Sequence, residues 1–117
     1  MQTLRYVVLS HADVGEPHFD LMFETLPGSM LATWRSETWP IERRTALERL
    51  RDHRRLYLDY EGQLSEQRGT VYRIAEGNCE VEVGEEAVWT IRLFSGAPPQ
   101  KLIFRKISGE RWEAEPG

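Results

Sequence analysis

Cysteine is nearly missing from this 117-residue chain, which contains only Cys79. A single cysteine excludes an internal disulfide and a zinc cluster built from cysteines, and it is typical of the reducing cytoplasm, where we expect the protein to be located. Cys79 itself is expected to be an inert, buried thiol. The chain also lacks a run of about 18 apolar residues, the length that a membrane helix needs, and an apolar secretory stretch after Met1. We therefore expect no membrane partner.

An excess of positive charge is missing as well, because 15 basic residues face 19 acidic ones and give a net charge of −4. This balance argues against broad, sequence-blind coating of nucleic acid, although it leaves room for a local basic patch. Residues 42–55 are the exception, since they contain six arginines against three acidic residues. Either a phosphate-bearing ligand approaches this segment, or the segment is a solvated charged face.

Short β-branched and aromatic runs take the place of long apolar ones. A hydrophobic fraction of 40% with 29% charged residues is typical of a globular chain, and the length fits one domain over residues 1–117. Turn residues, such as those at 76–78 and 95–99, separate the runs, which predicts a mainly-β antiparallel sandwich or barrel. The predicted strands are residues 4–10, 18–24, 30–35, 70–74, 79–83, 87–94 and 101–107.

One segment has the pattern of a helix rather than of a strand. Pro40 suits an early helical position, and Ile41, Leu47 and Leu50 form a short apolar stripe at helical spacing. We therefore predict the principal helix over residues 41–51, in a fold with one or two short helices.

Two of the three histidines lie in a stretch that alternates like a strand. His18 and Asp20 share its polar face, while the turn residues Gly15 and Pro17 allow His11 to fold back towards them. Imidazole nitrogens and a carboxylate oxygen are ligands that divalent transition metals prefer. The pattern therefore indicates a metal site of His11, His18 and Asp20, and a simple hydrogen-bonded His-x-Asp pair on a sheet surface is the alternative.

Two motifs follow each other along the chain. The first is Val7-Val8-x-x-His11 through His18-Phe19-Asp20-Leu21, and the second is Asp52-His53-x-x-x-Tyr57-x-Asp59-Tyr60-Glu61-Gly62. In this order they resemble the 3′-phosphoesterase domain found at the N-terminus of bacterial DNA ligase D and as stand-alone proteins. The likeness extends from about Tyr6 to Trp112.

The resemblance implies a small, strongly curved antiparallel β-barrel that binds a divalent metal, Mn²⁺ in the first place, with Zn²⁺ or Co²⁺ as alternatives. It implies removal of a 3′-phosphate or a terminal ribonucleoside from nucleic-acid 3′ ends in DNA repair, with a repair ligase or end-joining proteins as partners. His11, His18 and Asp20 are the implied metal ligands. His53 is the implied catalytic and phosphate-binding residue, and Tyr57 lies beside it.

Several basic residues of the family pattern are absent here. Where the family has an arginine two residues after the metal aspartate, this chain has Met22. Where the family has a lysine in the loop after the tryptophan, this chain has Thr38. Such cations neutralise phosphate oxygens in the transition state. We expect Arg43 or Arg44 to supply a replacement, and Met22→Arg to raise turnover if the pocket has room.

Two other function classes remain open at this stage. The missing cations favour a catalytically weakened module that binds nucleic-acid ends or a protein partner. A non-haem iron oxygenase is the second alternative, because His18, Asp20 and His53 have the composition of a two-histidine, one-carboxylate site.

Overall fold

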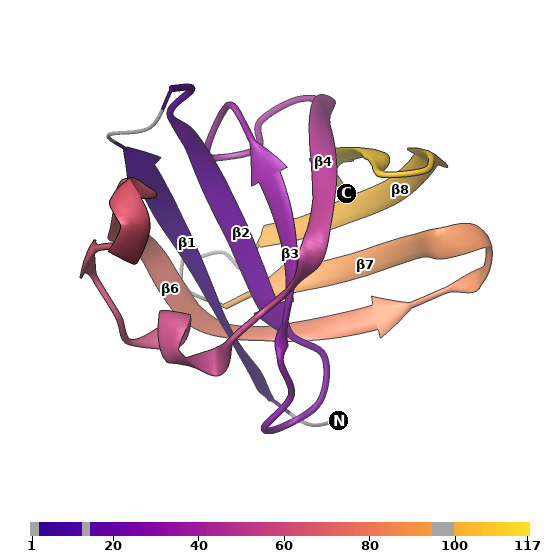
Figure 1. The fold of residues 1–117 in the computed structure, drawn as a ribbon. Helices are drawn as coiled ribbons and strands as arrows, with labels where there is room; N and C mark the ends of the chain where they lie inside the picture. Colours follow the sequence, from indigo (N-terminus) through magenta and orange to yellow (C-terminus); the bar gives the residue numbers. More distant parts are fainter. Residues whose placement is uncertain (1–2, 13–14, 95–99) are drawn as a thin grey trace.

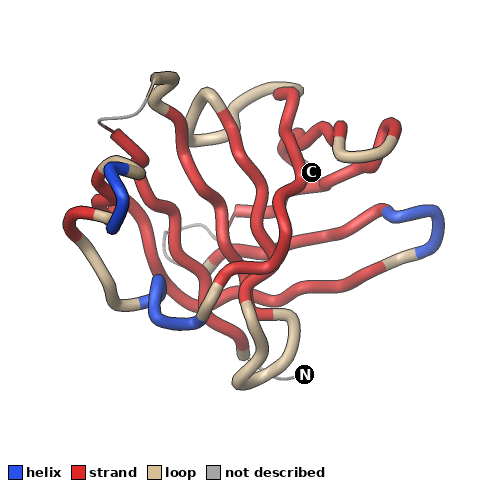
Figure 2. The backbone as a smooth tube through the Cα atoms, viewed as in Figure 1, coloured by secondary structure: helices blue, strands red, loops and turns tan. Residues whose placement is uncertain are grey.

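The computed structural model describes residues 3–12, 15–94 and 100–117, so the separator predicted at 95–99 lies outside the described residues. It confirms a mainly-β fold, and its helical segments are short 3₁₀ turns (Figure 2). The strands are β1 (Leu4–Ala12), β2 (His18–Glu24), β3 (Leu31–Ser36), β4 (Thr45–His53), β5 (Gly62–Gln63), β6 (Thr70–Val83), β7 (Val88–Leu93), β8 (Gln100–Ser108) and β9 (Arg111–Pro116). The 3₁₀ helices are η1 (Arg55–Leu58), η2 (Ser65–Gln67) and η3 (Glu85–Ala87).

The sheet closes on itself as an antiparallel barrel. Neighbouring strands follow the order β1-β2-β3-β4-β9-β8-β7-β6 (Figure 1). The circle closes because residues 70–79 of β6 pair with the whole length of β1. The short β5 pairs with β6 outside this circle. Among the described residues, no helix is long and apolar enough to span a membrane.

Aromatic side chains fill the barrel. Trp34 is fully buried, with ring centroids 4.8 Å from Phe104, 5.1 Å from Trp89 and 5.3 Å from Trp112. Phe104 is a core residue, and Trp89 packs against the core from a partly buried position. Cys79 is also buried, and burial raises the pKa of its thiol to about 12, as expected for an inert cysteine.

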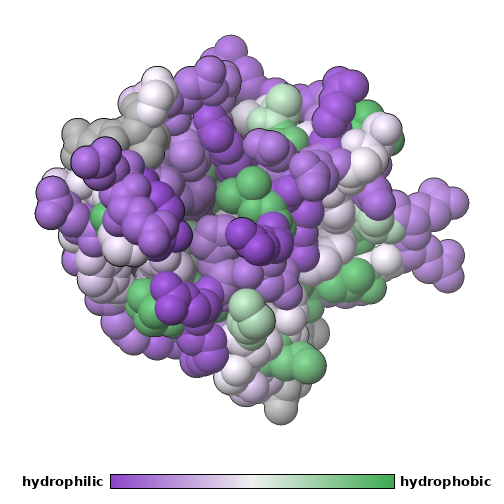
Figure 3. Space-filling view, in the orientation of Figure 1, coloured by the Kyte–Doolittle hydropathy of each residue, from purple (hydrophilic) through white to green (hydrophobic). Residues whose placement is uncertain are grey.

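A second, smaller apolar cluster lies on the outer face of β1–β3. Alternation places Val7, Leu9 and Met22 on this face, and the segment that follows β4 covers them with Tyr57 and Leu58. Leu31 and Val71 complete the cluster, and all of its members are buried. The surface over β1–β4 is therefore mostly hydrophilic, with small separate hydrophobic patches (Figure 3).

The helix predicted over 41–51 is wrong, because β4 begins at Thr45 and pairs with β3 and β9. Leu47 and Arg49 are the inward residues, and the Arg49 guanidinium lies over the Trp34 ring, 4.3 Å from its centroid. An arginine thus occupies an inward position of the strand. The alternation of period two is therefore hidden, and Ile41, Leu47 and Leu50 give an accidental helical spacing.

Two strands of the second half differ from the predicted ranges. Residues 76–78 were expected to form a turn, but they pair with β1 through Val7, Tyr6 and Arg5, so β6 is continuous from residue 70 to residue 83. Pairing with β1 thus overrides the local turn preference of this segment. Strand β9 was not predicted at all, although it completes the barrel between β4 and β8.

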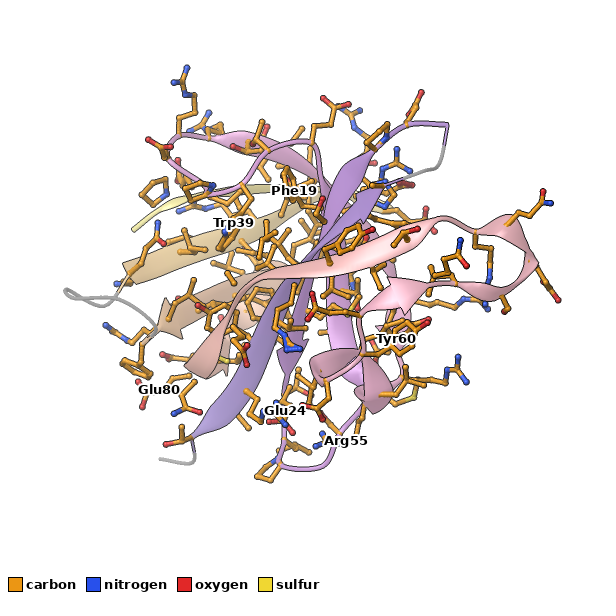
Figure 4. All side chains as sticks on the ribbon, turned by 90° about the vertical axis from the view of Figure 1, so that its left-hand side faces the viewer. Phe19, Glu24, Trp39, Arg55, Tyr60 and Glu80 are labelled. Atoms are coloured by element: carbon orange, nitrogen blue, oxygen red, sulfur yellow. The ribbon has the colours of Figure 1, made fainter. Side chains whose placement is uncertain are left out.

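Glu24, which is 4% exposed, binds the segment that follows β4 and contains η1. Its carboxylate accepts hydrogen bonds from the Arg55 guanidinium (2.5 Å) and from the backbone N–H groups of Arg5 (2.7 Å) and Gly28 (3.3 Å). Glu24 and Arg55 lie next to each other below Tyr60 in Figure 4. Burial opposes ionisation, but the Arg55 and backbone hydrogen bonds outweigh it and lower the pKa of Glu24.

We expect Glu24→Gln to lower the free energy of unfolding by about 2 kcal/mol at neutral pH, since it removes a charge-assisted hydrogen-bond acceptor. The pKa of Glu24 is lower in the folded state. Its ionisation therefore stabilises the fold above the unfolded-state pKa of about 4.3, and this contribution is lost as the pH falls through the folded-state pKa. Urea denaturation at a series of pH values measures both effects, with the exposed Glu110→Gln as the matched control. An acid dependence identical to that of the wild type would contradict the assignment.

Candidate metal centre

The β1–β2 hairpin brings His11, His18 and Asp20 together at one end of the outer face. His11 and His18 are direct partners in the ladder, and Asp20 pairs with Leu9, two residues before His11. The three potential ligand atoms all lie within 4.8 Å of one another. The residues that the alternation pattern singled out therefore share one site, which they reach from two neighbouring strands.

Asp20 lies between the two imidazoles. Its Oδ2 is 3.2 Å from Nδ1 of His11, and its Oδ1 is 3.2 Å from Nε2 of His18. The carboxylate is almost fully buried, and Oδ1 has no hydrogen-bond partner among the described residues. A buried carboxylate oxygen without a partner is costly unless a cation neutralises it, so the donor set fits a divalent metal.

Both histidines are oriented by backbone carbonyls. Nε2 of His11 donates to the carbonyl oxygen of Arg68 (2.6 Å), and Nδ1 of His18 donates to that of Glu16 (2.9 Å). Each ring uses its distal N–H in this way, so the nitrogen that faces Asp20 carries the lone pair in the neutral form. Metal-binding histidines are typically held by hydrogen bonds of this kind.

The electrostatic balance at His18 is set by its neighbours. The hydrogen bond that a protonated His18 would donate to Asp20 raises the pKa of His18, although burial and the positive charge of Arg35 act in the opposite direction. A cation next to Asp20 is therefore favoured, either as the imidazolium or as a metal ion.

His53 and Tyr57 lie together, but away from the three metal-site residues along the strands. Their ring centroids are 5.8 Å apart, and Nδ1 of His53 donates to the Arg51 carbonyl (2.9 Å). His53 pairs with Leu31 of β3, whereas Asp20 pairs with Arg35 of the same strand. These two positions are four residues apart, a separation of about 13 Å along β3. Tyr57 belongs to the outer apolar cluster.

The arginines of the basic segment do not form one patch. Arg44 lies 3.5 Å from Glu115 and 3.9 Å from Glu113 on β9, and the carbonyl of Arg43 accepts a hydrogen bond from the Thr45 hydroxyl. No described contact links Arg43 or Arg44 with the metal-site residues. The local charge excess seen in the sequence is therefore distributed over several parts of the barrel.

Sequence reasoning missed Arg35, which the structure places beside the metal-site residues. Arg35 is the direct ladder partner of Asp20, and directly paired residues project from the same face of a sheet. Its guanidinium lies 3.1 Å from the Glu16 carboxylate. The pairing of residues 18–24 with residues 31–36 would have revealed it, but only with the register known.

No protein-family model matches the chain, and no curated protein matches it either. The function is therefore inferred from the geometry of the site and from the two sequence motifs.

Proposed function

We propose that the protein is a metal-dependent 3′-end phosphoesterase of DNA repair, a divergent stand-alone relative of the phosphoesterase domain of DNA ligase D. The observation that carries the proposal is the convergence of His11, His18 and Asp20, with an unpartnered carboxylate oxygen and two imidazoles oriented by carbonyls. These residues would hold the ion, with manganese the first candidate and zinc or cobalt the next. When bound, a divalent ion supplies a Lewis acid for a phosphoryl oxygen.

The chain's own side chains supply the remaining parts of such a site. Arg35 provides positive charge next to Asp20, where charge on a phosphoryl group must be neutralised. The Arg51 carbonyl fixes the tautomer of His53, so its Nε2 is left to interact with a substrate. Since His53 lies about 13 Å along the strand from the level of Asp20, we propose that it contacts a phosphate further along the bound end, with Tyr57 packed beside it.

The test is release of phosphate or of a ribonucleoside from DNA with a defined 3′ end, with and without manganese. We expect weak, manganese-dependent turnover, and we expect His53→Ala to reduce it by about 10-fold, the loss typical of one hydrogen bond to a charged group. The neighbouring exposed Arg54→Ala is the matched control. Equal turnover in His53→Ala and Arg54→Ala would remove His53 from the mechanism.

One observation favours a second candidate function, a module that binds nucleic-acid ends without processing them. Met22 stands where the related family has a phosphate-binding arginine, and here it is 1% exposed within the outer apolar cluster. Bound manganese without turnover on either kind of 3′ end would support this alternative. The iron-oxygenase set of His18, Asp20 and His53 is not favoured, because His11 is the histidine grouped with His18 and Asp20.

The burial of Met22 adds an expectation about stability to the one about turnover for Met22→Arg. A guanidinium at this position displaces apolar neighbours such as Leu9 and Tyr57 or becomes buried among them, and both outcomes are destabilising. We expect the free energy of unfolding to fall by about 3 kcal/mol, whereas the volume-conserving Met22→Leu costs less than about 1.5 kcal/mol. Thermal unfolding of both variants is the measurement. An unchanged melting temperature with raised turnover for Met22→Arg would show that the cation finds room.

A further inference from the structure

Arg35 is fixed opposite the most buried residue of the metal centre. Its backbone pairs with that of Asp20 in the β2–β3 ladder, so the two Cβ atoms start about 5 Å apart on the same face. The Asp20 side chain is 5% exposed, whereas that of Arg35 is 30% exposed. A cation that is open to solvent therefore stands beside a buried anion and its two imidazoles.

The partner that now holds Arg35 is weakly bound. Glu16 approaches the guanidinium to 3.1 Å, but its side chain is 84% exposed. An ion pair this exposed to solvent contributes between 0 and about 1 kcal/mol, because water screens it and both side chains lose freedom. A ligand with a greater negative charge than one carboxylate can displace Glu16 at little cost.

The surroundings of Arg35 restrict what such a ligand can be. Arg35 lines a cavity of about 520 Å³ between the metal-site end of β3 and strands β4 and β9. Glu37, Glu48 and Glu113 line it as well, with Arg111 as the other cation. A polyanionic strand laid through this cavity would be repelled, whereas a single terminal phosphate group needs to reach Arg35 alone.

We propose that Arg35 is the phosphate-binding residue of this site and that Glu16 is its displaceable counter-ion, which favours a terminal phosphomonoester over an internal phosphodiester as ligand. The guanidinium can donate two parallel hydrogen bonds to two oxygens of such a group, whereas a lysine ammonium acts as a point charge. Arg35 thereby takes the role of the cation that is missing at Met22. This inference rests on the proposed phosphoesterase function.

The experiment is isothermal titration calorimetry of manganese, and then of inorganic phosphate, on the wild type and four variants. We expect Arg35→Ala to weaken phosphate binding by about 10- to 100-fold, the usual loss for hydrogen bonds to a charged group. Arg35→Lys should be intermediate, because it keeps the charge and loses the fork. Glu16→Gln should strengthen phosphate binding by up to about fivefold, since it removes the competitor. Arg92→Ala, at an exposed position on β7, should leave phosphate binding unchanged.

The manganese titration separates this inference from the proposed function. If all variants bind manganese as the wild type does, but Arg35→Ala and Arg35→Lys also bind phosphate equally well, then Arg35 only holds Glu16 and the inference is overturned. The phosphoesterase proposal would survive that result. If the wild type binds no manganese, both proposals fail together. Arg35→Lys keeps the test decisive if Arg35→Ala does not fold.

Discussion

Replacing Asp20 by asparagine is expected to lower the affinity for manganese by at least about 100-fold while the metal-free protein stays folded. Mutation of groups that merely orient metal ligands costs about 10- to 100-fold, and Asp20 is the proposed ligand itself. Its carboxylate is the only negative charge between His11 and His18 within the three-residue site. Asparagine keeps the shape and removes the charge, so the metal-free barrel loses a buried carboxylate oxygen that has no partner.

Thermal unfolding with and without manganese checks this expectation. At a manganese concentration 100 times the dissociation constant, binding stabilises the wild type by about 2.7 kcal/mol, which raises the melting temperature by about 10 °C. Asp20→Asn should show no such rise. Asp59→Asn is the matched control, because the Asp59 side chain is 78% exposed and pairs with Arg5. A manganese-dependent rise that persists in Asp20→Asn would place the ion elsewhere and refute the metal centre.

The largest effect on stability is expected for Trp34→Ala. Trp34 projects from β3 into the barrel and is fully buried, in edge-on contact with Phe23, Phe104 and Trp112, and the Arg49 guanidinium lies over its ring. Truncation removes these contacts and leaves a cavity that the closed sheet cannot collapse to fill. The free energy of unfolding should fall by about 3–5 kcal/mol, a large part of the 5–15 kcal/mol typical of such domains.

Chemical denaturation followed by circular dichroism measures this loss. Tyr72→Ala is the control, because it also removes an aromatic ring, but Tyr72 is 50% exposed. Its effect should stay within about 0.5 kcal/mol. Comparable losses in the two variants would mean that the aromatic cluster inside the barrel does not dominate the stability.

The part of the fold that could be predicted from the sequence is the part governed by local alternation. Phe19, Leu21 and Phe23 face the core and His18 and Asp20 face outwards, as the pattern of period two requires. Alternation failed at β4, where a cation stacked on tryptophan occupies an inward position. Hydropathy does not recognise that arrangement, since it counts arginine as a surface residue.

The grouping of the three candidate metal ligands was predictable, but the charges around them were not. His11, His18 and Asp20 lie within ten residues, so one turn brings them together. Arg35 reaches the site through the register of the β2–β3 ladder, and Arg44 is drawn to Glu115 on β9. Both of these are pairings between distant segments. Local spacing carries no information about them, so it directed attention to Arg43 and Arg44 and not to Arg35.

Closure of the barrel between β1 and β6 has a consequence for the order of folding. The β1–β2 hairpin joins near neighbours, whereas the β1–β6 ladder joins Leu4 to Cys79 and Ala12 to Thr70 across 75 and 58 positions. Contacts so distant require a loss of chain entropy before they form, so we expect closure to come late in folding. The three candidate metal ligands belong to the local hairpin, but the Arg68 carbonyl that orients His11 arrives only with the segment leading into β6. We therefore expect the three side chains to come together first and to acquire their fixed orientation when the barrel closes.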